Sequence, residues 1–354
     1  MSDTNSTTVL GNEAQDRIAH FLKRRQLNET MISLLKEVKD QRELKKGEVT
    51  TAQNATYDAI IESVSKSLRE GWITTERVTQ ILDGAEVAGR QHICLFRIPD
   101  EQFAAVEASL QAPETLNTSG IQLDEFWEIP LGMYTRLMQN DNEFLVVKVT
   151  APRFYWIEDE KRPTEDRIEI VKQRERERSA VIIKLEKTKK LLQFRVPIRE
   201  KAPNADTGNS VYQFIVEIVR SQFGDAGDAW FNKLRPFPLS DAFQKIIENR
   251  DDFELYTDTP ENQHFKSSMS HKGAAADAKD IRDFAQWGFA EGFARTSIRG
   301  AWKREDSDVQ VRMHSEKIKT GQQMTRGIAR LFFSQPCSDQ EVEHVIRRIS
   351  EHLA

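Results

Sequence analysis

Apolar residues in the first ninety positions of the chain recur with the spacing of amphipathic helices. One set falls at positions i, i+3, i+4 and i+7, namely Met31, Leu34, Leu35 and Val38. Similar stripes begin at Tyr57 and at Val78, and each places its apolar side chains on one helix face. Because such a face must be buried against a partner, the pattern predicts a helical bundle over residues 12–90, after a disordered tail at residues 1–11.

Beyond residue 90 the pattern changes to short runs rich in β-branched and aromatic residues. Such residues fit a pleated, half-buried surface, so the runs predict strands. They read HICLFRI from position 92, EFWEIPL from 125, EFLVVKV from 143, RFYWI from 153, SIRGAWK from 297, VQVRMHS from 309 and ARLFFS from 329. The sequence therefore predicts an α+β protein, in which the N-terminal helical bundle is followed by mixed, largely antiparallel sheet modules with flanking helices. The predicted modules cover residues 91–201 and 202–354.

Residues 180–198 match each other like the two arms of a β-hairpin. The facing pairs are Leu185 with Leu192, Ile183 with Phe194, Val181 with Val196, Lys184 with Gln193, and Ile182 with Arg195. Apolar pairs on one face stabilise such a pairing, and a four-residue turn over Lys187 to Lys190 preserves it. Further out the same register would oppose like charges, so the pairing should end near Ala180.

The segment before this hairpin, RERER at positions 174–178, is compatible with two structures. As a strand it would place Arg174, Arg176 and Arg178 on one side and both glutamates on the other, which makes a cationic stripe. As a helix it would form pairs at i and i+3 that neutralise one another. The sequence alone leaves both alternatives open.

The formal net charge of −5 hides an asymmetry along the chain. Residues 161–201 carry 14 Lys and Arg against 7 Asp and Glu, a local charge of +7, so the remainder carries −12. A basic segment in an acidic protein indicates contact with a polyanion, although a solvated charged surface has the same composition. The candidate nucleic-acid-binding residues are Lys172, Arg174, Arg176, Arg178, Lys187, Lys189, Lys190 and Arg195. Nearby Phe154, Tyr155 and Trp156 offer rings on which unpaired bases could stack.

Motifs for nucleotide, hydrolase and metal chemistry are absent from the sequence. It contains no G-x-x-x-x-G-K-[ST], no G-x-G-x-x-G, no G-x-S-x-G and no H-E-x-x-H, so we expect no cofactor and no metal. Residues 57–86 have the outline of a helix-turn-helix, but the second helix is too acidic to approach phosphates well. The polar loop at 257–283, which carries His264, His271 and Asp280, leaves a metal-dependent hydrolase of nucleic acid as an alternative.

Localisation and partners follow from composition. The chain has two cysteines, Cys94 and Cys337, in settings typical of buried reduced thiols. It shows no secretory signal and no apolar run near the roughly 18 residues of a spanning helix, so we expect a cytoplasmic protein without membrane contact. The favoured function is a non-enzymatic accessory protein that binds nucleic acid, single-stranded or non-specific, or an acidic partner through the basic hairpin. Its helical domain would dock a protein partner or a second copy of the chain, and a scaffold subunit without nucleic-acid contact is a further alternative.

Overall fold

The structure is a computed structural model. It describes residues 28–45, 47–52, 55–87, 89–112, 116–117, 129–163, 168–199, 206–248, 252–261, 269–270, 294–304, 308–320 and 324–353. The predicted tail at residues 1–11, most of the EFWEIPL run and the loop residues His264, His271 and Asp280 lie outside this described part. The chain divides into two compact units, one of Met1–Val87 with Ser119–Pro130 and one of Ala88–Thr118 with Leu131–Ala354. The domain limits predicted from the sequence remain predictions.

The first unit contains three described helices, α2 (Asn28–Gln41), α3 (Tyr57–Arg69) and α4 (Thr75–Val87). Their apolar cluster is built mainly from α2 and α3, and Val78 is the only fully buried apolar residue that α4 contributes among its described side chains. Two other buried residues of α4 are polar, Thr79 and Glu86. The prediction of an N-terminal helical bundle is wrong, since among the described side chains of α4 only Val78 and the half-buried Ile81 reach this small cluster.

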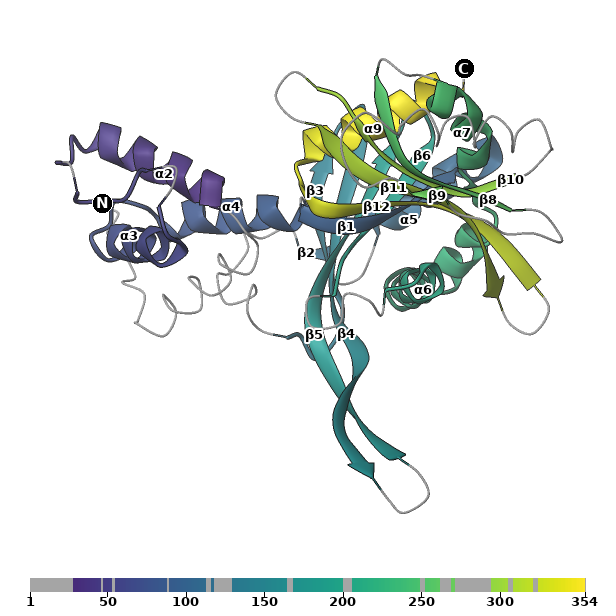
Figure 1. The fold of residues 1–354 in the computed structure, drawn as a ribbon, viewed down its shortest axis with the longest axis horizontal. Coiled ribbons are helices and arrows are strands. Elements are labelled where there is room, and N and C mark those ends of the chain that lie inside the picture. Colours follow the sequence, from purple (N-terminus) through teal and green to yellow (C-terminus); the bar gives the residue numbers. More distant parts are fainter. Residues whose placement is uncertain are drawn as a thin grey trace. The chain divides into compact units, whose positions relative to one another are not determined.

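The second unit is built on one largely antiparallel sheet (Figure 1). Its 12 described strands run in the order β2-β3-β4-β5-β6-β1-β12-β11-β10-β8-β9, with β7 also pairing with β1. The strands are β1 (Gly89–Arg97), β2 (Leu116–Asn117), β3 (Tyr134–Asn140), β4 (Phe144–Pro163), β5 (Ile168–Glu186), β6 (Leu191–Pro197), β7 (Arg235–Pro236), β8 (Phe253–Glu261), β9 (Met269–Ser270), β10 (Ala294–Trp302), β11 (Val309–Thr320) and β12 (Met324–Cys337). Among the strand pairs that the structure describes, only the short β2–β3 pair is parallel.

The prediction of separate sheet modules is wrong, because β1 joins both halves. On one side Cys94 of β1 pairs with Phe194 of β6, and on the other side it pairs with Arg330 of β12. Residues 91–96 of β1 are all buried, as expected for a central strand that is covered on both faces. The strands before and after residue 201 therefore belong to a single continuous sheet.

Helices cover the two faces of this sheet. On one face, α5 (Phe103–Gln111), which follows the short helix η1 (Asp100–Gln102), and α6 (Gly208–Phe231) share a core with strands β1, β4, β5 and β6. On the other face, α7 (Leu239–Glu248) and α9 (Asp339–Glu351) share a core with strands β8, β10, β11 and β12. The helix α9 begins with a capping box, which the motif Ser338-Asp-Gln-Glu341 predicts and in which Ser338 and Glu341 bond reciprocally.

Two further sequence predictions concern the thiols and the membrane. Cys94 and Cys337 are buried and form no disulfide, as predicted. Burial raises the pKa of each thiol to about 12, so neither is a reactive thiolate near neutral pH. No helix in the described part of the chain is both long enough and apolar enough to cross a membrane.

The hairpin predicted around residues 187–190 is confirmed in register. Strands β5 and β6 pair Ile182 with Arg195, Ile183 with Phe194, Lys184 with Gln193 and Leu185 with Leu192. The chain reverses through a four-residue turn at 187–190. The pairing of β5 with β6 ends at Ile182, close to the predicted limit at Ala180.

Candidate nucleic-acid interface

The RERER segment is a strand, and it pairs with β4. Strands β4 and β5 are matched from Phe144 with Glu186 to Pro163 with Ile168. The neighbouring strands stop earlier, since β3 reaches Thr150 of β4 and β6 reaches Ile182 of β5. The outer parts of β4 and β5 therefore form a two-stranded ribbon beyond the sheet, as Figure 1 shows.

One side of this ribbon carries arginines and exposed aromatic rings. Trp156 pairs with Arg174, Phe154 with Arg176, and Pro152 with Arg178, so these side chains share a face. Trp156 is 63% exposed and Phe154 is 40% exposed, and together with Leu131 they are the exposed large hydrophobic residues of the described chain. We call the exposed set the ribbon face: Phe154, Trp156, Lys172, Arg174 and Arg176.

Cations and rings are in direct contact on the ribbon face. The guanidinium carbon of Arg174 lies 4.1 Å from the ring centroid of Phe154, which is a cation–π contact. Lys172, Arg174 and Arg176 are exposed, whereas Arg178 at the base of the ribbon is half-buried. None of these three exposed cations forms an ion pair with another residue in the described ranges. Their charges are therefore open to an external anion.

The opposite side of the ribbon is fixed to the body of the second unit. Arg153 is buried and binds Asp206, with Nη2 2.6 Å from Oδ1, and it also donates to the carbonyl of Pro197 at 2.9 Å. Next to it, the Tyr155 hydroxyl donates to Glu175 at 3.0 Å. Burial lowers the pKa of Arg153 to about 10 against the opposing effect of Asp206, so Arg153 stays charged near neutral pH. These contacts hold one side inward and leave the ribbon face outward.

The lysines at the hairpin turn are already paired with acceptors. Lys187 lies 2.8 Å from Glu107, Lys189 lies 2.7 Å from Glu186, and Lys190 lies 2.7 Å from Asp100. The hydrogen bond and charge of Lys190 lower the pKa of Asp100. These lysines therefore lie apart from the ribbon face, and each forms an ion pair with a carboxylate of the same chain.

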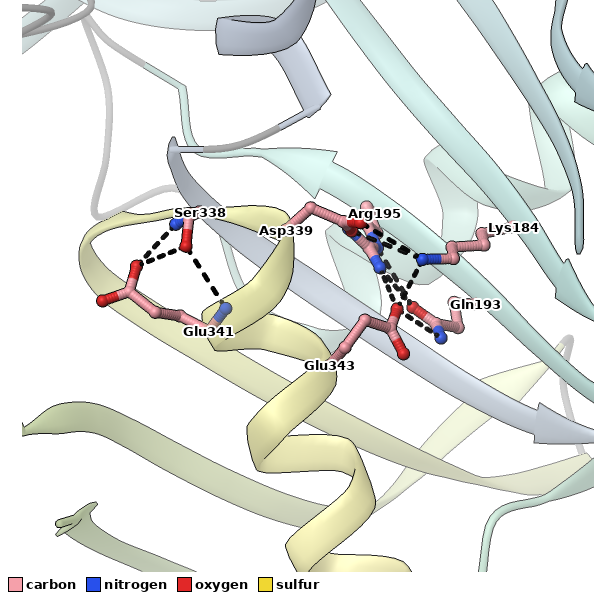
Figure 2. A network of polar contacts seen from close by, with 7 residues as sticks. All are labelled: Lys184, Gln193, Arg195, Ser338, Asp339, Glu341 and Glu343. Carbon is pink, nitrogen blue, oxygen red and sulfur yellow. Dashed lines mark hydrogen bonds and ion pairs between the residues drawn. The ribbon is translucent and has the colours of Figure 1, made fainter. Parts of the chain in front are cut away.

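Arg195 is buried beneath the first turn of α9, in the polar network that Figure 2 shows. Its Nη1 and Nη2 each lie 2.5 Å from a carboxylate, of Asp339 and Glu343 respectively. Lys184 joins the same two carboxylates, with Nζ 2.8 Å from Oε1 of Glu343. Arg195 therefore ties α9 to β6, and an external macromolecule has no access to it.

This network predicts a pH dependence of stability. Burial alone would raise the pKa of Asp339, but the charges of Arg195 and Lys184 outweigh it and lower the pKa. A carboxylate with a lowered folded-state pKa stabilises the fold above its unfolded value near 4, and this contribution is lost as pH falls through the folded value. Asp339→Asn should lower the free energy of unfolding by about 1 kcal/mol at pH 7, a modest effect because the side chain is 46% exposed.

The measurement is urea denaturation of both proteins at several pH values. The gap between wild type and Asp339→Asn should shrink below about pH 4, because the wild-type carboxyl is then protonated. Asp225→Asn is the control, since Asp225 is exposed on α6. A gap that persists unchanged at pH 2 would contradict an electrostatic origin.

Sequence reasoning missed how the ribbon is organised. It placed Phe154, Tyr155 and Trp156 near the arginines but did not pair their strand with RERER. The signal was present in the alternation, because pairing Trp156 with Arg174 also sets Arg153 opposite Glu177 and so matches opposite charges on the inner side. The aromatic half of the ribbon face follows from that register.

Neither a metal site in the described residues nor a match to known proteins gives a further guide to the role of the ribbon face. Within the ranges that the structure describes, no group of three or more His, Cys, Asp or Glu side chains could hold a metal ion. Comparison with protein-family models and with curated proteins found no match to this chain.

Proposed function

We propose that the chain is an accessory protein that binds single-stranded nucleic acid through the ribbon face. The observation that supports the proposal most is the exposure of Trp156 beside Arg174 and Arg176, on a side opposite to a buried anchor. An exposed tryptophan buries little surface in the folded chain, so its ring is available for a ligand. Proteins that bind single strands combine aromatic stacking with cations that follow the backbone.

The spacing of the two rings on the ribbon favours a nucleic-acid strand whose bases are spread apart over one whose bases are stacked on each other. Phe154 and Trp156 are two residues apart on β4, which corresponds to about 6.7 Å along a strand. This is about twice the roughly 3.4 Å rise between bases in a duplex strand. One base on each ring therefore requires a strand whose bases are separated, with phosphates beside Lys172, Arg174 and Arg176.

Single strands should accordingly bind better than duplexes. A two-stranded β-ribbon fits the major groove of DNA, but paired bases cannot stack on Trp156. The proposal keeps Lys172, Arg174 and Arg176 from the sequence-based set, leaves out the half-buried Arg178, and adds Phe154 and Trp156. Lys187, Lys189, Lys190 and Arg195 are left out because carboxylates of the chain already pair with them.

The test is a triple variant, Trp156→Ala with Arg174→Ala and Arg176→Ala. Loss of a stacked base costs about 1–3 kcal/mol, so affinity for a labelled single-stranded oligonucleotide should fall at least about 10-fold at low salt. Loss of two phosphate contacts should also reduce the slope of log affinity against log salt by about 1.4. Fluorescence anisotropy over a salt series measures both quantities, and a duplex of the same length gives the comparison.

The matched control is Leu131→Ala with Arg220→Ala and Arg347→Ala. It removes one exposed apolar side chain and two exposed arginines elsewhere, with exposures of 92%, 69% and 58%. It should bind like wild type. Equal weakening by both triple variants, or no binding of wild type near 50 mM salt, would contradict the proposal.

A further inference from the structure

A second group of arginines lies on the sheet, far along the strand order from the ribbon. Arg299 of β10 is directly opposite Arg312 of β11, and Arg312 is directly opposite Phe332 of β12. Phe332 in turn pairs with His92 of β1, and the two rings stack with centroids 4.8 Å apart. These residues form a row across four strands on one face of the sheet.

Like charges directly opposite each other destabilise a sheet, so the Arg299–Arg312 pair needs an explanation. A third arginine, Arg330 of β12, lies opposite His314 of β11, and Glu316 pairs with it. Burial lowers the pKa of Arg312, and the charges of Arg299 and Arg330 lower it further. The row therefore concentrates positive charge that the fold itself does not favour.

Two carboxylates near this row contact side chains other than Arg299 and Arg312. Oε1 of Glu316 forms an ion pair with Nη2 of Arg330 at 2.5 Å and lies 3.2 Å from Nδ1 of His314. Glu254 accepts a hydrogen bond from the Tyr256 hydroxyl. Neither Arg299 nor Arg312 forms an ion pair with a carboxylate in the part of the chain that the structure describes.

The row also stands outside the apolar core of its face. The cluster beneath α5 and α6 includes Ile328 of β12 but takes no described residue from β8, β10 or β11. Arg312 is exposed and Arg299 is half-buried. Both guanidinium groups can therefore meet a ligand from solvent.

We propose that Arg299 and Arg312 form a binding site for the phosphoryl group of a small molecule. Two guanidinium groups on adjacent strands can donate several hydrogen bonds to one tetrahedral anion, and arginine matches phosphate oxygens in bidentate geometry. The bound anion removes the repulsion between them. Further along the same face, Nη1 of Arg330 lies 2.9 Å from Nδ1 of His92, which holds these two side chains in place. This site is independent of the ribbon face and goes beyond the function proposed for it.

In thermal denaturation, Arg312→Gln should melt above wild type without phosphate and below it with pyrophosphate. In phosphate-free buffer at low salt the variant should melt about 1–3 °C above wild type, because removing one charge relieves the repulsion. Adding pyrophosphate should raise the wild-type Tm by about 5–10 °C when its concentration is near 100 times Kd. The variant should show little of this rise, so the order of the two Tm values reverses.

The control is Arg347→Gln, which removes an exposed arginine that is paired with Glu351. It should keep the full pyrophosphate response and should not gain stability in phosphate-free buffer. The proposal is overturned if Arg312→Gln responds to pyrophosphate like wild type, or if it melts below wild type without phosphate. A rise caused by a single-stranded oligonucleotide but not by pyrophosphate, and lost in Arg312→Gln, would overturn it as well and assign the row to nucleic acid.

Discussion

Replacing Asp206 by alanine should lower the free energy of unfolding by about 3–5 kcal/mol. The Asp206 carboxylate is fully buried and lies 2.6 Å from Arg153 and 3.2 Å from Arg199. It also accepts the backbone N–H of Arg199 at 2.9 Å. Its removal takes the closest counter-ion from the buried charge of Arg153, which is far more costly than losing an exposed ion pair. Urea denaturation followed by circular dichroism measures the loss.

A compensating variant shows whether the cost comes from the uncompensated charge. The double replacement Arg153→Met with Asp206→Leu removes both charges and keeps apolar volume, so it should be more stable than Asp206→Ala alone. Asp206→Asn should be intermediate, because it keeps the shape and one acceptor oxygen. If Asp206→Ala costs less than about 1 kcal/mol, the carboxylate does not hold the inner side of the ribbon.

Replacing Phe231 by alanine should cost a similar amount, about 3–5 kcal/mol, through packing rather than charge. Phe231 is buried at the end of α6, with ring centroids 5.7 Å from Phe96 of β1 and 5.7 Å from Phe194 of β6. Tyr212 and Trp230 of α6 also lie within aromatic contact, at 5.8 and 6.0 Å. One ring therefore joins α6 to two neighbouring strands, and its loss opens a cavity where the helix meets the sheet.

Chemical denaturation with a conservative partner variant checks this prediction. Phe231→Leu fills most of the volume and should cost roughly half as much. The slope of the unfolding transition should stay constant across the three proteins, since the same surface is exposed on unfolding. Equal stability of Phe231→Ala and Phe231→Leu would argue that the site collapses around the missing ring.

Local features of the fold could be predicted from the sequence because neighbouring residues determine them. The hairpin register at residues 182–195 follows from facing apolar pairs a few positions apart, and the α9 cap follows from four consecutive residues. The single sheet could not be predicted in the same way, because Cys94 pairs with Arg330 across more than two hundred positions. The unbroken apolar run of β1 was the available signal for a central strand.

The residues of the candidate site also differ in whether neighbouring sequence could predict their environment. Alternation in RERER predicted arginines on one side if the segment were a strand, and the structure has that strand. The burial of Arg195 could not be predicted, because its partners Asp339 and Glu343 come from a helix much later in the chain. Composition reports how many cations a segment carries, whereas the tertiary fold decides which of them keep their charge available.

The position of β1 between β6 and β12 also has a consequence for the order of assembly during synthesis. When the ribosome has completed β6, one edge of β1 can pair at once. Most of the other edge must wait for β12, since β7 meets only Phe96 and Arg97 before then. In that interval an apolar strand presents a row of unsatisfied N–H and C=O groups, the kind of edge on which chains associate wrongly. A strand that is buried in the finished fold is therefore open to misassembly while the chain is being made.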